Sequence, residues 1–398
     1  MKEKSRKCTG QNEYRIHVIE DIRSIQDIRN SWKDMQWHPN ADIDYFLLIL
    51  KLRKEILKPY ILVLSKDNIP ITLLVGRVEE IRIQYKIGYK TIFAPKVRQL
   101  SFIYGGFMGD KSYIHTEMLI SEVVNLLKMG EADVAFFNSL KVDSDIYHLT
   151  RAKPGIFCRD YILEISLHWK MTLPNLINEF YNKMSAKHRY WLRRMSRLLE
   201  KDYAGEIIFK YYQKKDQVDQ LCIDAERIAE KTYQKEIGVG FIDNIEMRER
   251  LMLSADYGWL RGYLLYASGR PCAFWIGTLY HNICYLDYTG YDSDFQKYEP
   301  GTILFTKMIE DLCNHNIKTI DFGFGDALYK QRFGDENCKE SSVYIYAPTL
   351  KGIVLNIKRI LTTFIALCLS YIIKRMQLYN KIKKIWRKRL LSKPKKAD

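Results

Sequence analysis

Ionisable side chains gather between residues 321 and 332, and their types are those that transfer protons. The possible bases in and near this segment are Asp287, Asp321 and Asp326. Tyr329 could act as an acid, since a phenol has an ordinary pKa of about 10. Lys330 is a further catalytic candidate, and Lys330 and Arg332 could also hold a phosphate or a carboxylate. The structural alternatives are that Asp321 orients a strand end, Asp326 caps the next turn, Tyr329 packs in the core and the two cations form a solvated helix face.

A second chemical signal lies at Pro300-Gly301-Thr302, which precedes a predicted helix from Ile303 to Asn314. Proline loses nothing at a first helical position, and glycine allows another molecule to approach the exposed amides. A helix start of this kind favours negative charge. We therefore expect an anion, such as a phosphate, to bind there.

These two signals are positioned by a predicted strand–helix–strand unit. Residues Ile283–Tyr291 form a strand-like apolar and aromatic run, the helix follows, and Thr319–Gly325 is a second strand. A polar turn rich in Tyr, Lys and Arg comes next. The order predicts a βαβ unit with a site at the carboxyl edge of its strands.

The residues of this unit resemble the second half of a GNAT acyltransferase, and more closely the BioF2-like (CelD/BcsL) branch with its FemAB relatives. The resemblance depends on four ordered fragments: Gly290–Asp292, Tyr298–Thr302, Asp321–Asp326 and Tyr329–Gly334. It implies that an acyl-CoA donor lies between two splayed strands, with its pyrophosphate on Pro300–Thr302. The implied donor-binding residues are Tyr298, Pro300, Gly301, Thr302, Phe322 and Gly323. The alternative is an ordinary α/β core whose glycines serve only turns.

The resemblance also implies a mechanism in which an amine attacks the thioester directly and Tyr329 returns a proton to the leaving thiolate. One feature departs from the wider GNAT pattern. The usual Gln/Arg-x-x-Gly-x-Gly/Ala loop is missing, and only Gly301 remains of its glycines. Glu299 stands where the branch commonly has serine, and its carboxylate could cap the helix but would repel a pyrophosphate.

The order of predicted elements occurs twice along the chain, which predicts tandem domains. The expected boundaries are an N-terminal GNAT-like domain at 1–167, a catalytic GNAT domain at 168–348 and a basic tail at 349–398. Tyr161–Ile165 is the expected last strand of the first domain, and the boundary is expected near Leu167–Leu173. Gly105-Gly106 is interpreted as a plain turn. By resemblance, the first half shapes the acceptor pocket.

The predicted helix Ser185–Lys201 has a basic face. Arg189, Arg193 and Arg197 recur every four residues and could hold phosphates of a donor, a nucleotide-linked sugar or tRNA, or form a solvated face. Arg189, Arg193, Asp321 and Arg332 are the candidate substrate-binding residues. The dispersed histidines and eight single cysteines have no zinc-type spacing, so we expect no metal and mostly buried, reduced thiols. No DNA-reading motif is present.

The charge of this 398-residue chain is concentrated in its tail. The formal net charge is +16, and from Lys351 onward 14 Lys or Arg stand against one Asp. The uncharged run Ile360–Ile373 is shorter than the roughly 20 residues of a spanning helix, and basic pairs flank it. Ile382–Leu390 mixes apolar and cationic residues, as in an interfacial helix. We expect the tail to bind an anionic membrane surface; the alternatives are packing on the second domain and a solvated tail.

Together these features predict an α/β protein with tandem GNAT-like (acyl-CoA N-acyltransferase) domains and a basic C-terminal helical tail. The expected function is acyl transfer, with acetyl-CoA as donor, to an amino group of a sugar or other envelope precursor. One alternative is a FemAB-like transferase that uses aminoacyl-tRNA. Another is a catalytically silent membrane-associated scaffold in polysaccharide biosynthesis. The N-terminus lacks the apolar run of a signal peptide, so the expected location is cytoplasmic, on the inner membrane face.

Overall fold

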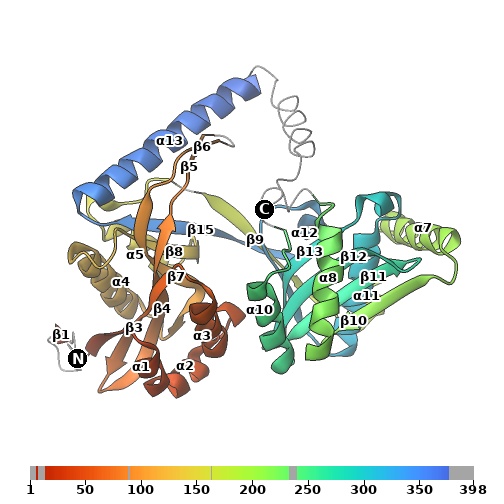
Figure 1. The fold of residues 1–398 in the computed structure, drawn as a ribbon, viewed down its shortest axis with the longest axis horizontal. Coiled ribbons are helices and arrows are strands. Elements are labelled where there is room, and N and C mark those ends of the chain that lie inside the picture. Colours follow the sequence, from red (N-terminus) through yellow and green to blue (C-terminus); the bar gives the residue numbers. More distant parts are fainter. Residues whose placement is uncertain (1–5, 8–13, 88–89, 163, 233–239, 376–398) are drawn as a thin grey trace. The chain divides into compact units, whose positions relative to one another are not determined.

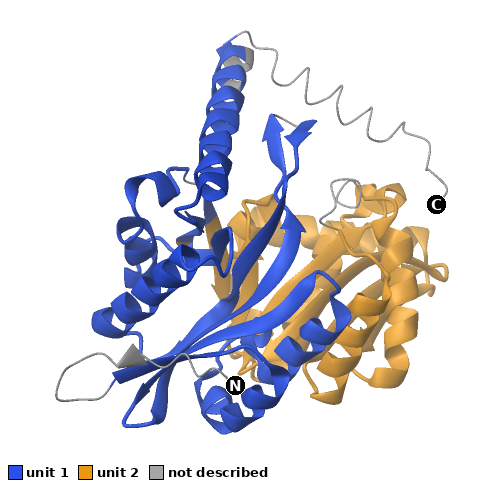
Figure 2. Ribbon diagram, turned by 60° about the vertical axis from the view of Figure 1, so that its left-hand side comes forward, with its two compact units in different colours: residues 1–166, 339–398 blue, residues 167–338 orange. Residues whose placement is uncertain are grey.

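The computed structural model describes residues 6–7, 14–87, 90–162, 164–232 and 240–375. The chain forms two compact units, which Figure 2 shows in different colours. Unit 1 comprises residues 1–166 and 339–398, and unit 2 comprises residues 167–338. Each unit contains its own set of paired strands and its own hydrophobic core.

Unit 1 is a mostly antiparallel sheet with helices on both faces (Figure 1). Its strands are β1 (Arg6–Lys7), β2 (Tyr14–Ile19), β3 (Ile56–Lys66), β4 (Ile69–Arg82), β7 (Lys96–Gly109), β8 (Val134–Lys141) and β15 (Glu336–Tyr346), in the order β1-β2-β3-β4-β7-β8-β15, with β5 (Tyr85–Ile87) and β6 (Lys90–Phe93) as a separate hairpin. Its helices are α1 (Ile22–Asp27), α2 (Arg29–Met35), η1 (Pro39–Ala41), α3 (Ile43–Leu52), α4 (Tyr113–Lys128), α5 (Asp145–Ala152), η2 (Ile156–Cys158) and α13 (Leu350–Arg375).

Strand β3 is buried on both faces because helices cover both sides of the sheet. Ile61 and Val63 pack in one core with Trp32 of α2. Leu62, between them in the chain, points to the other face and packs in a second core with Val123 of α4. This alternation is the period-two geometry of a strand, and it explains why β3 is a nearly continuous apolar run.

The last strand of unit 1 differs from the prediction. Tyr161–Ile165 was expected to supply it, but of the described residues in this segment only Ile165, the first residue of β9, is in a strand. The edge of β8 is instead paired by β15, with Glu340 opposite Lys141. Unit 2 therefore ends at Cys338, whereas the expected second domain ran to residue 348. The strand beside β8 thus comes from a part of the chain far from β8, and a pattern of neighbouring residues cannot predict such a pairing.

The interpretation of Gly105-Gly106 as a plain turn is wrong. Both glycines lie within β7. Gly105 has φ +80, and a Cβ there would lie 2.6 Å from Cβ of His38. The pair thus allows close packing of His38 against a distorted strand, where an ordinary side chain would clash.

The strands of unit 2 are of mixed direction and pair in the order β9-β14-β13-β12-β11-β10. Its strands are β9 (Ile165–Thr172, in unit 2 from Leu167), β10 (Ile207–Tyr212), β11 (Leu260–Ala267), β12 (Arg270–Tyr280), β13 (Ile283–Tyr291) and β14 (Thr319–Phe324). Its helices are α6 (Ile177–Lys183), α7 (Ala186–Asp202), η3 (Lys215–Gln217), α8 (Val218–Ala229), α10 (Ile245–Asp256), η4 (Ser293–Tyr298), α11 (Pro300–Asn314) and α12 (Leu328–Phe333). The predicted βαβ unit is present as β13, α11 and β14.

Helix α13 is longer than the predicted uncharged run Ile360–Ile373, because it begins ten residues earlier, at Leu350. Its first half packs on unit 1. The hydroxyl of Tyr85 donates to the carbonyl of Leu355 at 3.0 Å, and the amide of Asn356 donates to the carbonyls of Phe157 and Arg159. The predicted interfacial helix around Ile382–Leu390 lies outside the described residues.

Candidate active site

The candidate active site lies where two parallel strands of unit 2 separate. β13 and β14 pair at only three positions, the last of which joins Tyr285 to Asp321. Beyond this point β13 stays on β12 as far as Tyr291, and β14 stays on β9 as far as Phe324. The gap therefore begins beside Asp321, and the β14-facing edge of β13 is available to pair with an extended ligand.

A buried carboxylate–imidazole pair stands at the start of this gap. Nε2 of His168, on β9, lies 2.6 Å from Oδ1 of Asp321, and both side chains are almost fully buried. The amide of Gly323 donates to the same oxygen at 2.8 Å, and Nζ of Lys170 lies 3.5 Å from Oδ2. Burial opposes ionisation of Asp321, but the hydrogen bond from His168 and the neighbouring cations lower the pKa of its carboxyl. The sequence analysis missed His168.

Lys330 is the second titratable group at this site. Its side chain is 7% exposed, and its Nζ donates to the carbonyl of Phe324 at the end of β14. Burial lowers the pKa of Lys330 to about 8, and the charge of Asp321 partly opposes this shift. With this pKa, roughly a tenth of the Lys330 side chains are free amine at pH 7 and about half at pH 8, and a general base acts in this form. Gly334 lets the end of α12 approach β9 closely, since a Cβ there would lie 2.7 Å from the Lys330 carbonyl oxygen and 2.8 Å from Cε3 of Trp169 on β9.

Tyr329 is half-buried beside the same cluster. Its ring packs edge-on against Trp275, 5.3 Å between centroids, and against Phe322 at 6.0 Å. Phe322 is buried and also contacts Phe305. The indole of Trp275 in turn donates to the carbonyl of Gly301 at 3.0 Å. Trp275, which the sequence analysis did not select, thus contacts both the phenol and the start of α11.

The start of α11 fits an anionic ligand in two respects. A Cβ at Gly301 would meet only Cδ1 of Tyr291, at 3.8 Å, so the space above this glycine is open. No side chain caps the helix, although Glu299 precedes it with φ +54. The Glu299 carboxylate remains nearby, 3.5 Å from Oγ1 of Thr302. Pro300 occupies the first helical position, as predicted.

The remaining catalytic candidates lie differently. Asp287 is on β13 just past the last pairing position, where Thr278 donates to it at 2.8 Å. The residue is exposed at the surface, but many protein atoms lie around its carboxyl. The resulting partial desolvation raises the pKa of that carboxyl. Asp326 is exposed and accepts a hydrogen bond from Gln331. The expected helix-capping role of Asp326 is wrong, because Ala327 is the N-cap of α12.

Three other selected residues are held by structural contacts. Tyr298 is buried, and its hydroxyl donates to Asp202 at 2.6 Å. Arg189 donates to the carbonyls of Tyr181 and Met184, at the end of α6. The guanidinium of Arg332 lies 5.6 Å from the ring centre of Trp191. Arg193 is exposed on α7. The cluster at the gap is therefore Asp321, His168, Lys330 and Tyr329.

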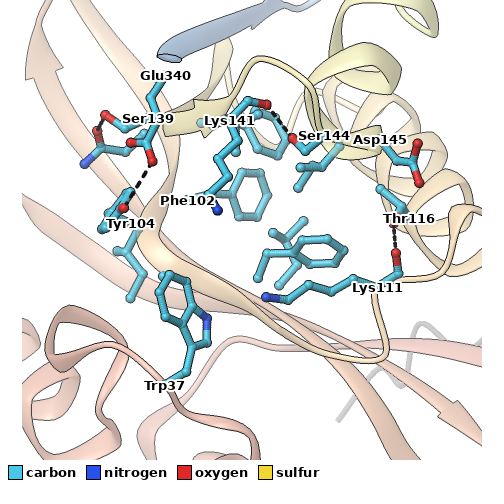
Figure 3. A pocket seen from close by; sticks show the side chains of 18 of the residues that line it. Trp37, Phe102, Tyr104, Lys111, Thr116, Ser139, Lys141, Ser144, Asp145 and Glu340 are labelled. Carbon is cyan, nitrogen blue, oxygen red and sulfur yellow. Dashed lines mark hydrogen bonds between the residues drawn. The ribbon is translucent and has the colours of Figure 1, made fainter. Parts of the chain in front are cut away.

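Unit 1 contains a pocket of about 560 Å³ in the corresponding place (Figure 3). Its own parallel pair, β7 and β8, is joined as far as Phe102 and Phe137 and then separates. Trp37, Lys111 and Lys141 face the hollow. Lys111 Nζ lies 5.1 Å from the ring centre of Trp37, and burial together with the charge of Lys141 lowers its pKa.

A buried carboxylate also lines this pocket. Glu340 of β15 is 2% exposed, and the hydroxyl of Tyr104 donates to its Oε1 at 3.3 Å. Ser139 beside it has φ +51, and its amide donates to Oγ of Ser342. Aromatic rings, two amines and the carboxylates of Asp143, Asp145 and Glu340 line a cavity of a size that suits a small polar ligand. Among the described residues of both units, no group of three or more His, Cys, Asp or Glu side chains could hold a metal ion.

Comparison with known proteins supports the GNAT assignment. Residues 186–331 match the family model described as an acetyltransferase (GNAT) domain. The structure is similar to the crystal structure of FemX, with a TM-score of 0.54 and 11% identity over 83% of this chain and 97% of FemX. A tandem GNAT protein from the clavulanic acid biosynthesis pathway matches with a TM-score of 0.48 and 7% identity, over 84% of this chain and 99% of that protein. No curated protein sequence matches this chain.

These findings confirm the predicted α/β fold, since the FemX likeness spans most of both chains. The GNAT family implies an acyl-CoA donor. The match covers the separated strands, the start of α11 and the segment that carries Asp321, Tyr329 and Lys330. Residues 186–331 are a GNAT acetyltransferase domain, and this domain is a GNAT-type acyltransferase.

Proposed function

We propose that this protein transfers an acetyl group from acetyl-CoA to an amino group of a sugar or other cell-envelope precursor. The observation that carries the proposal is the position of a titratable cluster at the separation of β13 and β14. Asp321, His168 and Lys330 meet there, and the open helix start at Gly301 belongs to the same βαβ unit. A thioester donor supplies the activated acyl group; the residues described below bind, orient and move protons.

The edge of β13 beyond Tyr285 binds the donor as an added strand, through backbone hydrogen bonds. The amides at the start of α11 hold its pyrophosphate, because Gly301 leaves them open to approach. Glu299 weakens this interaction by charge repulsion.

Lys330, as free amine, removes a proton from the attacking ammonium or from the tetrahedral adduct. The nitrogen–carbon bond forms, the carbon–sulfur bond breaks, and Tyr329 gives its hydroxyl proton to the departing thiolate. The proton held by Lys330 then returns to the Tyr329 phenolate directly or through solvent, which restores both groups. Asp321 acts as a positioning residue: it fixes His168 and the turn at Gly323, and it sets the charge near Lys330.

The pocket of unit 1 binds the acceptor in this proposal. Trp37 and Tyr104 offer ring surfaces for an apolar sugar face, and Glu340 can accept hydrogen bonds from hydroxyl or amino groups. Lys111 and Lys141 can pair with a phosphate or carboxylate on the same molecule, beside the carboxylates of Asp143 and Asp145 in the same lining.

The test is a thiol-release assay with acetyl-CoA and a panel of amino sugars and amine-bearing envelope precursors, with and without phosphate groups. We expect turnover with at least one amino sugar, and tighter binding of its phosphorylated form. Asp321→Asn should abolish most turnover, and Lys111→Ala should weaken acceptor binding alone. Turnover with aminoacyl-tRNA and none with any acyl-CoA would contradict the proposal.

A further inference from the structure

We infer that helix α13 and its two neighbouring elements form a docking surface for an anionic lipid bilayer. The surface is independent of the acyl-transfer site, and all of its described residues belong to unit 1. It is called the α13 surface below, and it consists of α13, the β5–β6 hairpin and η2.

A continuous apolar stripe runs along the exposed side of α13. Its members are spaced alternately by four and three residues, so they lie on one helical face. They are Leu350, Val354, Ile357, Leu361, Phe364, Cys368 and Tyr371, and all are exposed. The opposite side of the first half is the packed one, with Leu355, Asn356 and Thr362 buried. An exposed stripe of this length on a soluble unit marks an interaction site.

Two neighbouring elements extend the apolar area. η2 and the β5–β6 hairpin both contact α13. η2 leaves Ile156 and Phe157 about two-thirds exposed, and Tyr161 follows it. Ile92 of β6 is nearly half exposed. In Figure 1 the hairpin lies beside α13. The exposed apolar area therefore extends over three elements and is wider than the apolar face of α13 alone.

The composition of α13 favours lipid over a second protein helix. An alternating four–three spacing also occurs in coiled coils, but those helices carry charged residues on either side of the seam. From Ile360 to Ile373 α13 has no charged residue at all. Ile365, Leu367, Leu369 and Ile372, which lie outside the stripe, are exposed as well. Exposed, uncharged side chains therefore extend beyond the stripe onto other sides of the helix, as lipid allows.

The charges around α13 point to anionic lipid. Lys358 lies at the hairpin, 5.0 Å from the ring centre of Phe93. Beyond Arg375 the sequence adds nine further Lys or Arg and one Asp. A positive segment that follows an apolar helix binds the negative surface of a bilayer through electrostatic attraction.

Helix α13 lies along the membrane in this inference and does not cross it. Leu350–Leu369 is long and apolar enough to span a bilayer, and 22% of it is buried. Arg359 points inward, however, 3.5 Å from Asp160 and 4.5 Å from the ring centre of Tyr344. Spanning would expose this ion pair and the buried Asn356 to hydrocarbon, at high cost. Arg359 is therefore a structural contact of unit 1.

The test is co-sedimentation of the full chain with vesicles of equimolar phosphatidylcholine and phosphatidylglycerol, and with vesicles of phosphatidylcholine alone. The variant Leu361→Asp/Phe364→Asp places two charges on the stripe. Ile114→Asp/Ile245→Asp makes the same change of charge at exposed apolar positions away from the α13 surface. All four side chains are exposed, so folding should persist, which circular dichroism would verify.

We expect the wild type and the control to pellet with anionic vesicles, and the stripe variant to bind at least about tenfold more weakly. Binding to neutral vesicles should be weaker, and salt of about 1 M should reduce anionic binding by screening. An environment-sensitive dye on Cys368, the exposed thiol among the described cysteines, should shift to shorter wavelength with anionic vesicles.

Three results would overturn the inference. The wild type could ignore both vesicle types. The stripe variant could bind like the wild type, in which case the basic tail alone would provide the contact. Alternatively, the wild type could be a dimer that the stripe variant converts to monomers with no change in vesicle binding, which would assign the stripe to a second copy.

Discussion

Both units contain a pair of parallel strands that separates, but the side chains at the two openings differ. In each, a parallel strand pair separates: β7 from β8 after Phe102 and Phe137 in unit 1, and β13 from β14 after Tyr285 and Asp321 in unit 2. In each, an antiparallel neighbour also places a buried ionisable side chain near the opening. Glu340 of β15 does so in unit 1, and His168 of β9 in unit 2.

The two openings differ in the groups that contact this buried ionisable side chain. Glu340 meets the phenol of Tyr104 in a pocket with two lysines, which is an arrangement for binding. His168 meets a carboxylate, and a buried lysine of lowered pKa stands beside the pair, which is an arrangement for proton transfer. The backbone provides the opening in both cases, and the side chains decide its chemistry. Variants at the unit 2 opening should therefore affect turnover.

The largest effect is expected from Asp321→Asn. The amide keeps the shape but loses the charge that His168 and the Gly323 turn depend on, so kcat should fall on the order of a hundredfold to a thousandfold. Thiol release under saturating substrates measures it. Asp256→Asn removes an exposed carboxylate that binds Lys215 and should leave kcat unchanged. Similar kcat values in the two variants would place the catalytic charge elsewhere.

Lys330→Met should lower kcat about a hundredfold and change its pH dependence. In the wild type the rate should rise as pH passes about 8, where the amine loses its proton, and this limb should be absent in the variant.

Stability should change with pH as well. The pKa of Lys330 in the folded protein lies below the ordinary lysine value of 10.5, so the folded state binds the proton less tightly and wild-type stability should rise between pH 8 and 10.5. Urea titrations across this range would measure that rise. If the wild type and Lys330→Met showed the same rise in stability, Lys330 would not be its source.

Tyr329→Phe should reduce kcat about tenfold with nearly normal donor affinity, because only the thiolate proton is affected. The edge-on contact with Trp275 is kept, so thermal stability should not change. Tyr190→Phe, at an exposed position on α7, is the matched control. A loss of stability without a kinetic effect would assign Tyr329 to packing.

The smallest effect is expected from Glu299→Gln. Removing an exposed carboxylate from the start of α11 should tighten CoA binding about two- to fivefold at low salt, and less at high salt. Glu310→Gln makes the same change further along the helix, where its partner is Lys307, and should have no effect. Weaker binding in Glu299→Gln would show that this carboxylate supports the donor site.

The sequence predicted the βαβ unit well, because its signals are local. Pro300 and Gly301 mark the helix start, and an apolar strand stands on either side of the helix. A motif could also indicate that Asp321, Tyr329 and Lys330 lie together, because they are close to one another in the sequence.

The missed parts depend on contacts between distant residues. His168 is 153 positions from Asp321, in a segment interpreted as the domain boundary, and strand β9 there was not predicted. The replacement of Tyr161–Ile165 by β15 is a similar case, because the pairing with β8 joins residues about 200 positions apart. Tyr298 was selected as a donor-binding residue from its motif. In the structure it is buried and its hydroxyl donates to Asp202, a contact that sequence spacing does not reveal.

The most direct test of the account is calorimetric titration of acetyl-CoA into the wild type and three variants. Gly301→Val places a branched side chain above the open helix start, and Gly155→Val is its control at another open glycine. Lys111→Ala alters only the unit 1 pocket. The account predicts that Gly301→Val weakens donor binding at least about tenfold, while the other two bind like the wild type. Full affinity in Gly301→Val, or loss of binding in Lys111→Ala, would contradict the assignment of donor binding to unit 2.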